Sequence, residues 1–147
     1  MANILFKKSF QHKTLKQTKF DDLWNRKGVF TTIRVIGKSR SLLFFNDHLK
    51  KLNKSINLQG IKIFIAKKDI NFIIKSLFQK NIYYNHLLRI AVTKKIISFS
   101  LRKREKINKK FIGILINYKR KNWELKHLKY NKILSHLNNI DRSCSEI

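Results

Sequence analysis

Runs of β-branched and alternating apolar residues predict several strands along the chain. Residues 30–36 (FTTIRVI) are rich in β-branched side chains, which favour extended backbone. Gly37 can then adopt the positive φ of a hairpin turn. Further strand patterns cover residues 42–45, 86–93, 95–101 and 111–118. Because short turns separate the strands of each hairpin, we expect an antiparallel sheet.

Three other segments repeat apolar residues at the spacing of an amphipathic helix. The first follows a capping residue, Asn46 or Asp47, and ends before Gly60. The predicted helices cover residues 47–57, 68–79 and 130–140. Residues 61–66 fit a short strand or an extended link, and residues 1–27 an irregular lead-in with a short strand. The predicted fold class is α+β: an antiparallel sheet with two helices packed on one face, plus a C-terminal helix.

The charge of the chain changes which partners are considered. Its 147 residues include 34 Lys and Arg but only 8 Asp and Glu, which gives a net charge of +26. Such an excess indicates a polyanionic partner, such as nucleic acid or an anionic membrane. However, the 26 Lys, 21 Ile and 14 Asn are all encoded by A/T-rich codons, so genomic base composition explains much of the excess as well. Either origin predicts weak, salt-dependent binding to polyanions.

Several classes of site and location lack support in the sequence. A single cysteine, Cys144, excludes an intrachain disulfide. The five histidines lack metal-binding spacing, so no metal site is expected. No apolar run approaches the roughly 18 residues of a membrane helix, and we expect a cytoplasmic protein. The densest basic cluster, residues 102–110, fits a solvated hairpin loop better than an RNA or phosphate patch, because no aromatic residues interleave with it.

Four short segments carry more specific information through their order along the chain. They are GVFTTIRV at 28–35, DHLKKLNKS at 47–55, LRIAVT at 88–93 and LKHLKY at 125–130. In this order they resemble the class IV (fold-type IV) pyridoxal-phosphate-dependent enzymes. That family includes branched-chain and D-amino acid aminotransferases and 4-amino-4-deoxychorismate lyase, and its second motif typically has the form E/D-H-L-x-R-L-x-x-S. The resemblance covers nearly the whole chain.

The resemblance implies pyridoxal 5'-phosphate as the cofactor and assigns roles to individual residues. Lys126 matches the catalytic lysine that forms the internal Schiff base and moves the substrate proton. Arg34 matches an arginine that contacts the cofactor phosphate, a dianion that a planar guanidinium suits. Arg89 stands where some members place an arginine near the substrate carboxylate, and Tyr130 near a tyrosine that contacts the cofactor ring oxygen. His48 is interpreted as a packing and capping residue.

The chain also departs from the family pattern. Lys94-Lys95 replaces an Arg-Gly pair, and Lys129 replaces an asparagine. The resemblance implies a second, larger domain that supplies a glutamate for the pyridine nitrogen and loops for the phosphate. We therefore expect an irregular lead-in (1–27), a small N-terminal α+β domain (28–118), and a linker with the start of an otherwise missing domain (119–147). The C-terminal helix would follow the lysine loop.

The functional prediction is a class IV aminotransferase-like protein that acts on amino acids. The forms Phe30-Thr31-Thr32 and 125–128 favour the 4-amino-4-deoxychorismate lyase type, a step of folate biosynthesis, whereas Thr32-Ile33-Arg34 favours a branched-chain aminotransferase type. We expect a truncated chain, inactive alone, that forms a homodimer or joins a separately encoded C-terminal half. The alternatives are a basic nucleic-acid-binding module without enzymatic activity and a decayed gene product.

Overall fold

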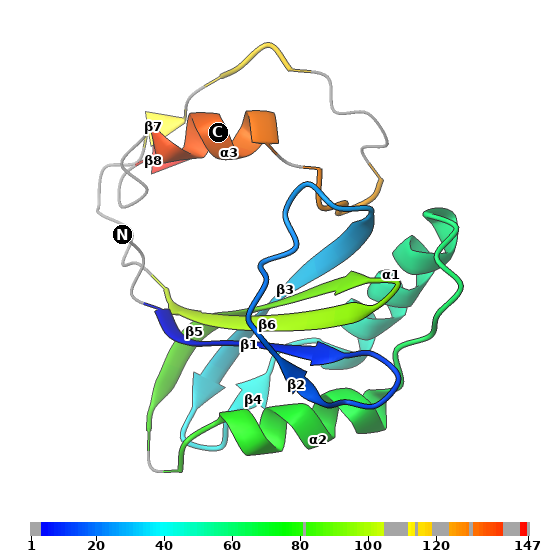
Figure 1. Ribbon diagram of the computed structural model, residues 1–147. Coiled ribbons are helices and arrows are strands. Elements are labelled where there is room, and N and C mark those ends of the chain that lie inside the picture. The colour runs from blue at the N-terminus through cyan, green and yellow to red at the C-terminus, as the bar shows by residue number, and fades with distance from the viewer. Residues whose placement is uncertain are drawn as a thin grey trace.

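A computed structural model describes residues 4–80, 82–104, 112–113, 115–118, 124–129, 131–139 and 145–146. The strands are β1 (Ile4–Gln11), β2 (Gln17–Thr18), β3 (Gly28–Gly37), β4 (Ser41–Leu42), β5 (Tyr84–Thr93), β6 (Ile96–Lys103), β7 (Ile112–Gly113) and β8 (Ser145–Glu146). The helices are α1 (Phe45–Leu58), α2 (Lys67–Leu77) and α3 (Asn131–Asn138), as Figure 1 shows.

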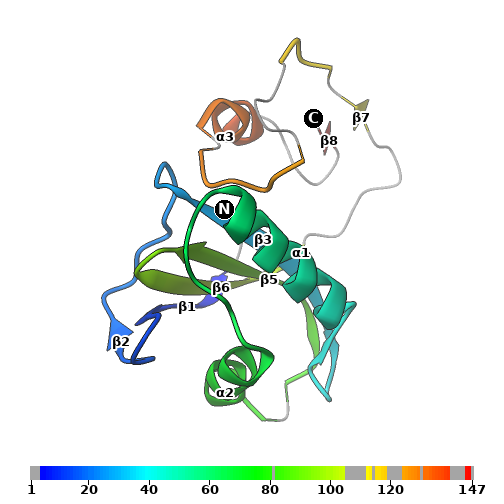
Figure 2. The same cartoon turned by 90° about the vertical axis from the view of Figure 1, so that its right-hand side faces the viewer.

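Six strands form one antiparallel sheet in the order β2-β1-β6-β5-β3-β4. The long strands β3, β5 and β6 are central, and the two-residue strands β2 and β4 lie at the edges. Helices α1 and α2 pack against the same face, whereas α3, β7 and β8 lie together at the other end of the molecule (Figures 1 and 2). The predicted α+β class, with two helices on one face and a further C-terminal helix, is confirmed.

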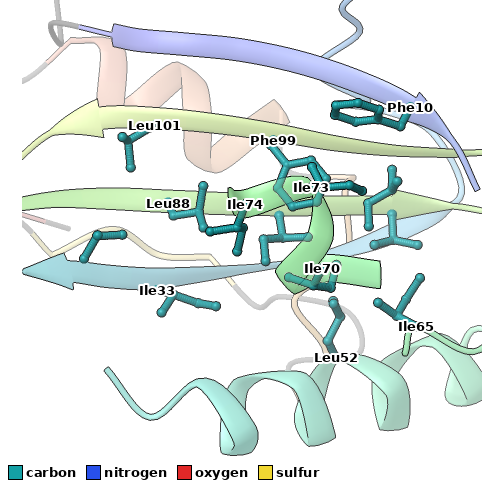
Figure 3. Packing of buried hydrophobic residues seen from close by; sticks show 14 of the residues in the cluster. Phe10, Ile33, Leu52, Ile65, Ile70, Ile73, Ile74, Leu88, Phe99 and Leu101 are labelled. Carbon is teal, nitrogen blue, oxygen red and sulfur yellow. The ribbon is translucent and has the colours of Figure 1, made fainter. Parts of the chain in front are cut away.

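The main core lies between the sheet and helices α1 and α2. Alternate residues of β3, including Val29, Ile33 and Val35, are fully buried and face the helices. The antiparallel register places Ile33 opposite Leu88, and Leu88 opposite Leu101, so each central strand adds to one apolar surface. Figure 3 labels ten members: Phe10, Ile33, Leu52, Ile65, Ile70, Ile73, Ile74, Leu88, Phe99 and Leu101. Each such burial stabilises the fold by roughly 1.5–3 kcal/mol.

The opposite face of the sheet carries polar and basic residues. We call it the helix-free face and define it by nine residues on three strands: Phe30, Thr32, Arg34, Leu87, Arg89, Ala91, Ser98, Ser100 and Arg102. A small second core covers one end of this face, where Leu23, Ala91 and Leu128 are buried and Trp24 packs beside them. The face is therefore apolar at one end and cationic toward the other.

Residues 1–27 are more ordered than their pattern predicted. The lead-in contains an eight-residue strand, β1, which pairs with β6 from Ile4 to Gln11. Its polar positions are satisfied by the sheet: Ser9 is fully buried, and its Oγ lies 2.7 Å from Ser98 Oγ. The expected short strand is therefore present, but its length and its pairing could not be predicted from the pattern, because its neighbour β6 lies about ninety residues further along the chain.

Two other predicted strands are much shorter in the structure. The strand over 42–45 is limited to Ser41–Leu42, because Phe44 adopts a left-handed conformation (φ 51°) that ends the strand and precedes α1. Phe44 is therefore the N-cap, and the prediction of Asn46 or Asp47 was wrong. Among the described residues of the predicted strand over 111–118, Ile112–Gly113 pairs with β8, and residues 115–118 have no regular structure.

No helix in the described part of the chain combines the length and the apolar content that crossing a bilayer requires.

Candidate active site

The loop that carries Lys126 is hydrogen-bonded to the first residues of β3. Phe30 N donates to Lys126 O (2.8 Å), and Leu128 N donates to Gly28 O (3.0 Å), so the loop pairs with β3 like a short extra strand. Leu128 is fully buried, and its carbonyl also accepts a hydrogen bond from Asn25 N (3.0 Å). The position of Lys126 is therefore set by backbone hydrogen bonds of its own carbonyl and of Leu128.

Gly28 makes this close approach possible. A Cβ at this position would overlap the backbone oxygen of Val92 and would lie 2.6 Å from Leu128 Cδ1. Only a residue without a side chain lets β5, β3 and the lysine loop meet here.

Lys126 lines a cavity of about 380 Å³ between β3, α1 and its own loop. We call this cavity the lysine pocket. Its lining residues are Phe30, Thr31, His48, Lys51, Leu52, Lys54, Ser55, Leu58, Glu124, Leu125 and Lys126. Three lysines, a histidine and two hydroxyl groups thus share one cavity. The helical spacing of His48, Lys51 and Ser55 places them on the same side of α1.

His48 is held in the wall of the lysine pocket by β3. Its Nδ1 lies 2.8 Å from Thr31 Oγ1. Burial lowers the pKa of His48 below its usual value, and the positive charges of Lys126 and Lys51 lower it further, against a smaller opposing effect of Asp47. His48 is therefore a neutral imidazole near neutral pH, hydrogen-bonded on one edge.

Arg34, the predicted phosphate contact, lies away from the lysine pocket. It is exposed on β3, and its Nη2 donates to Asn85 Oδ1 (3.2 Å). Arg34 is four residues beyond Phe30, which corresponds to about 13 Å along a strand. Its side chain is not among those that line the lysine pocket. Tyr130, the predicted contact of the cofactor ring oxygen, lies outside the described residues.

Arg89, the predicted substrate contact, is held between aromatic rings on the helix-free face. Its guanidinium carbon lies 3.7 Å from the ring centroid of Trp24 and 5.4 Å from that of Phe30. Nη1 donates to Asp22 O (2.9 Å). Burial lowers the pKa of Arg89 to about 10, so it stays charged at neutral pH; Asp22 opposes this shift and Arg102 adds to it.

The other edge of the Arg89 guanidinium is buried without a partner. Nε and Nη2 are shielded from solvent, and neither has a hydrogen-bond acceptor within the described part of the chain. An unsatisfied buried donor is costly, and such a donor in a native protein requires an explanation, of which a bound water, ion or ligand is one. Nε and Nη2 together present the two parallel N–H groups that bind a carboxylate in a bidentate manner.

The structure thus places the predicted residues in two groups. Lys126 lies with His48 and Lys51 in the lysine pocket, and Arg34 and Arg89 are diagonal neighbours on the helix-free face. Phe30 lies between the groups, because its backbone bonds to the lysine loop while its ring flanks Arg89.

Sequence reasoning missed two contributors to these sites. Lys51 occupies the arginine position of the family's second motif, which was the available signal. Trp24, which packs against Arg89, lies in a segment without strand or helix periodicity, so no local pattern singled it out.

Comparison with known families shows which family the chain belongs to. A family model for amino-transferase class IV matches residues 28–146, which include β3, α1 and the Lys126 loop. The chain belongs to the class IV aminotransferase family. A comparison with curated proteins finds no match. Class IV aminotransferases typically use pyridoxal phosphate, and the family suggests amino-acid substrates.

The lysine pocket has a donor set that fits this cofactor of the class IV family. The cofactor aldehyde requires a primary amine, which Lys126 provides, and the phosphate requires cations, which Lys51 and Lys54 provide. The volume lies within the range of small-ligand sites, roughly 300–1,000 Å³. Glu124 is the acidic side chain among the described residues that line it. No group of three or more metal-ligating side chains gathers in the described part of the chain.

Proposed function

We propose that this chain binds pyridoxal phosphate through Lys126 and acts on an amino acid, as a branched-chain aminotransferase or a 4-amino-4-deoxychorismate lyase. The observation that carries the proposal is that Lys126 shares one cavity with His48, Lys51 and Lys54 in a class IV family member. Of the 26 lysines in the chain, Lys126 is the one that both the family motif and this cavity select.

The bound cofactor would supply an electron-withdrawing ring that stabilises negative charge at the substrate α-carbon. The Lys126 amine would remove the proton from that carbon and, in transamination, return it elsewhere. Neutral His48, fixed through Thr31, would present an uncharged wall beside the amine rather than another cation. Both reactions begin with the same proton transfer, and therefore the pocket supports them equally.

The cofactor phosphate has two candidate cationic positions. The family motif assigns it to Arg34, whereas the shared cavity favours Lys51, with Lys54 one helical turn further along α1. A lysine ammonium binds phosphate as a point charge, which is weaker and less directional than a bidentate guanidinium. If Lys51 has this role, we expect a cofactor held less tightly than an arginine would hold it.

Arg89 is the proposed anchor for the substrate carboxylate. Its Nε and Nη2 lack an acceptor among the described residues, and the Trp24 and Phe30 rings exclude water around it. Arg89 does not line the lysine pocket, so the family motif, and not a shared cavity, supports this role. A charge-assisted hydrogen-bond pair in a partly dry site is a strong contact. Amino acids and 4-amino-4-deoxychorismate both carry a carboxylate that fits this anchor.

Covalent trapping tests the assignment of Lys126. The purified chain is incubated with pyridoxal phosphate, reduced with borohydride and digested, and the labelled peptide is identified by mass spectrometry. We expect the label on Lys126, its loss in Lys126→Ala, and its retention in Lys129→Ala, a matched change in the same loop. A label spread over many lysines, unaffected by Lys126→Ala, would disprove the proposed site.

Two neutral substitutions distinguish the phosphate positions in the same preparation. Lys51→Gln should weaken cofactor binding by about tenfold or more if it holds the phosphate, since a charged hydrogen bond contributes about 1.5–3 kcal/mol. Arg34→Gln should then leave the affinity nearly unchanged, and the reverse result would return the role to Arg34. Assays for amino transfer to a 2-oxo acid and for release of 4-aminobenzoate separate the two reactions.

A further inference from the structure

A second cavity lies at the turns that connect β1 to β2 and β5 to β6. Its volume is about 1,000 Å³, and it shares no lining residue with the lysine pocket. We call it the hairpin groove; its lining residues are Gln11, His12, Lys13, Thr18, Lys19, Phe20, Asp21, Asp22, Arg26, Lys94, Lys95 and Ile96. None of the residues to which the proposed reaction assigns a role lines it.

The hairpin groove has a strong excess of available positive charge. Lys13, Lys19, Lys94 and Lys95 all line it and are exposed. Its two carboxylates are already engaged. Asp21 forms an ion pair with Arg26 (2.5 Å) and accepts a hydrogen bond from Leu23 N, and Asp22 accepts one from Trp24 N. With Arg26, five basic side chains face two carboxylates, so a net positive charge remains to attract an external anion.

The backbone beneath these lysines is fixed before any ligand binds. His12 N donates to Lys95 O (2.9 Å), which joins the end of β1 to the β5–β6 turn. Within that turn, Thr93 Oγ1 accepts from Ile96 N (3.2 Å). The charged side chains consequently project from a preformed frame, which reduces the entropy cost of binding.

Aromatic side chains accompany this charge. Phe20 lies half-buried in the groove wall, and the Lys7 ammonium is 5.6 Å from its ring centroid. His12 also lines the groove, and its Nε2 lies 3.3 Å from the carbonyl of Phe64, a residue that is 70% exposed. A basic groove with aromatic faces is the arrangement by which proteins bind single-stranded nucleic acids, because lysines follow the phosphates and rings stack on bases.

We propose that the hairpin groove binds a single-stranded polynucleotide. The ligand is a strand rather than a membrane, because Phe20 lies in the groove wall among the lysines, and a ring beside cations suits bases and phosphates together. The four lysines would contact successive phosphates, and Phe20 would offer a stacking face. This site differs from the basic cluster at 102–110, and it is independent of cofactor binding.

The test measures binding of the full chain, freed of nucleic acid at high salt, to fluorescent oligouridylate about 12 nucleotides long. The groove variant carries Lys19→Gln, Lys94→Gln and Lys95→Gln. A matched control carries Lys68→Gln, Lys75→Gln and Lys80→Gln, three exposed positions that line none of the cavities described above. Both variants lose the same net charge, so any difference between them reports on the groove.

We expect the groove variant to bind at least tenfold more weakly than the control variant at moderate salt. Its slope of log affinity against log salt should fall by about 0.7 for each lost phosphate contact, roughly 2 in total. Phe20→Leu should weaken binding by about fivefold or more without changing that slope, because it removes stacking and not charge.

Equal losses in the two lysine variants would show that only bulk charge binds the strand, and would overturn the proposal. Tighter binding to phosphatidylserine vesicles, with the same dependence on the groove lysines, would overturn it in favour of a membrane surface. A DNA oligomer of matching sequence distinguishes RNA from DNA as the source of the strand, and preference for either supports the site.

Discussion

Single residues in this chain acquire a role through their neighbours rather than their type. Lys126 is one of 26 lysines, and what distinguishes it is a backbone bond to Phe30 and a cavity shared with His48 and Lys51. Arg89 likewise differs from the other arginines in the described part of the chain, because two rings hold it and one edge of its guanidinium lacks an acceptor. At this scale, chemistry follows from local packing.

The pKa of His48 provides a prediction at the residue scale. Because its pKa is lower in the folded chain than in the unfolded chain, the unfolded state binds more protons as the pH falls below about 6.5. Stability should therefore be fully present above that pH and decline on acidification. We expect His48→Gln to reduce this decline in pH-dependent thermal unfolding, and His86→Gln to do the same, since burial and Lys103 lower the pKa of His86.

Histidine NMR titrations check the cause directly. Lys51→Gln should raise the pKa of His48, and Asp47→Asn should lower it further, because these groups act with opposite signs. A His48 pKa at or above its usual value would contradict the lysine pocket as described.

At the scale of elements, the junction of β3, β5 and the lysine loop positions the whole site. β3 pairs with β5 along its full length on one side, and at its start it also accepts the loop through Gly28 and Phe30. Helix α1 then places His48 and Lys51 over the same end of β3. The pocket thus depends on three elements meeting at one strand end.

Gly28→Ala should weaken this junction. The added Cβ would overlap Val92 O, a backbone atom within the sheet that cannot move aside cheaply. We expect a loss of about 1–3 kcal/mol in the free energy of unfolding, measured by urea denaturation. Gly113→Ala is the matched control, because a methyl group added there would meet no atom within 4 Å among the described residues. Equal stability of the two variants would show that β5 and the lysine loop do not approach Gly28 as described.

At the scale of the whole molecule, charge is the dominant property. A net charge of +26 on 147 residues means that most lysines have no acidic partner available. Folding concentrates these charges, and their mutual repulsion lowers stability. Two cavities, the lysine pocket and the hairpin groove, are each lined by several of these lysines.

We therefore expect added sodium chloride to raise the melting temperature at neutral pH, because salt shortens the screening length to about 8 Å at 0.15 M. The Lys68→Gln, Lys75→Gln, Lys80→Gln variant should melt higher at low salt and respond less to salt. A melting temperature independent of salt in the unmodified chain would contradict this view of its charge.

Much of the architecture could be predicted from local patterns. Strand β3, the β5–β6 hairpin and helices α1 and α2 follow from apolar periodicity, because each buries one side against a continuous core. Helix α3 follows from the same periodicity, although none of its residues is buried. A short strand was expected within residues 1–27, but the length of β1, its pairing with β6 and Phe44 as the N-cap could not be predicted, because pairing with a distant strand and one left-handed residue leave no periodic signal. The division at residue 118 and the roles of Arg34, Arg89 and Lys126 stay predictions.

The sequence by itself determined the fold class, the family and the candidate lysine, because periodicity and motif order are properties of the chain alone. Only the tertiary structure decided which cations share the cavity of Lys126. Lys51 lines the same cavity as Lys126, whereas Arg34 lies on the other face and is hydrogen-bonded to Asn85. A sequence motif could not show this, because it does not specify where its residues lie in space. The physical reason is the two-residue repeat of a strand, which turns Thr31 and Arg34 of β3 to opposite faces of the sheet.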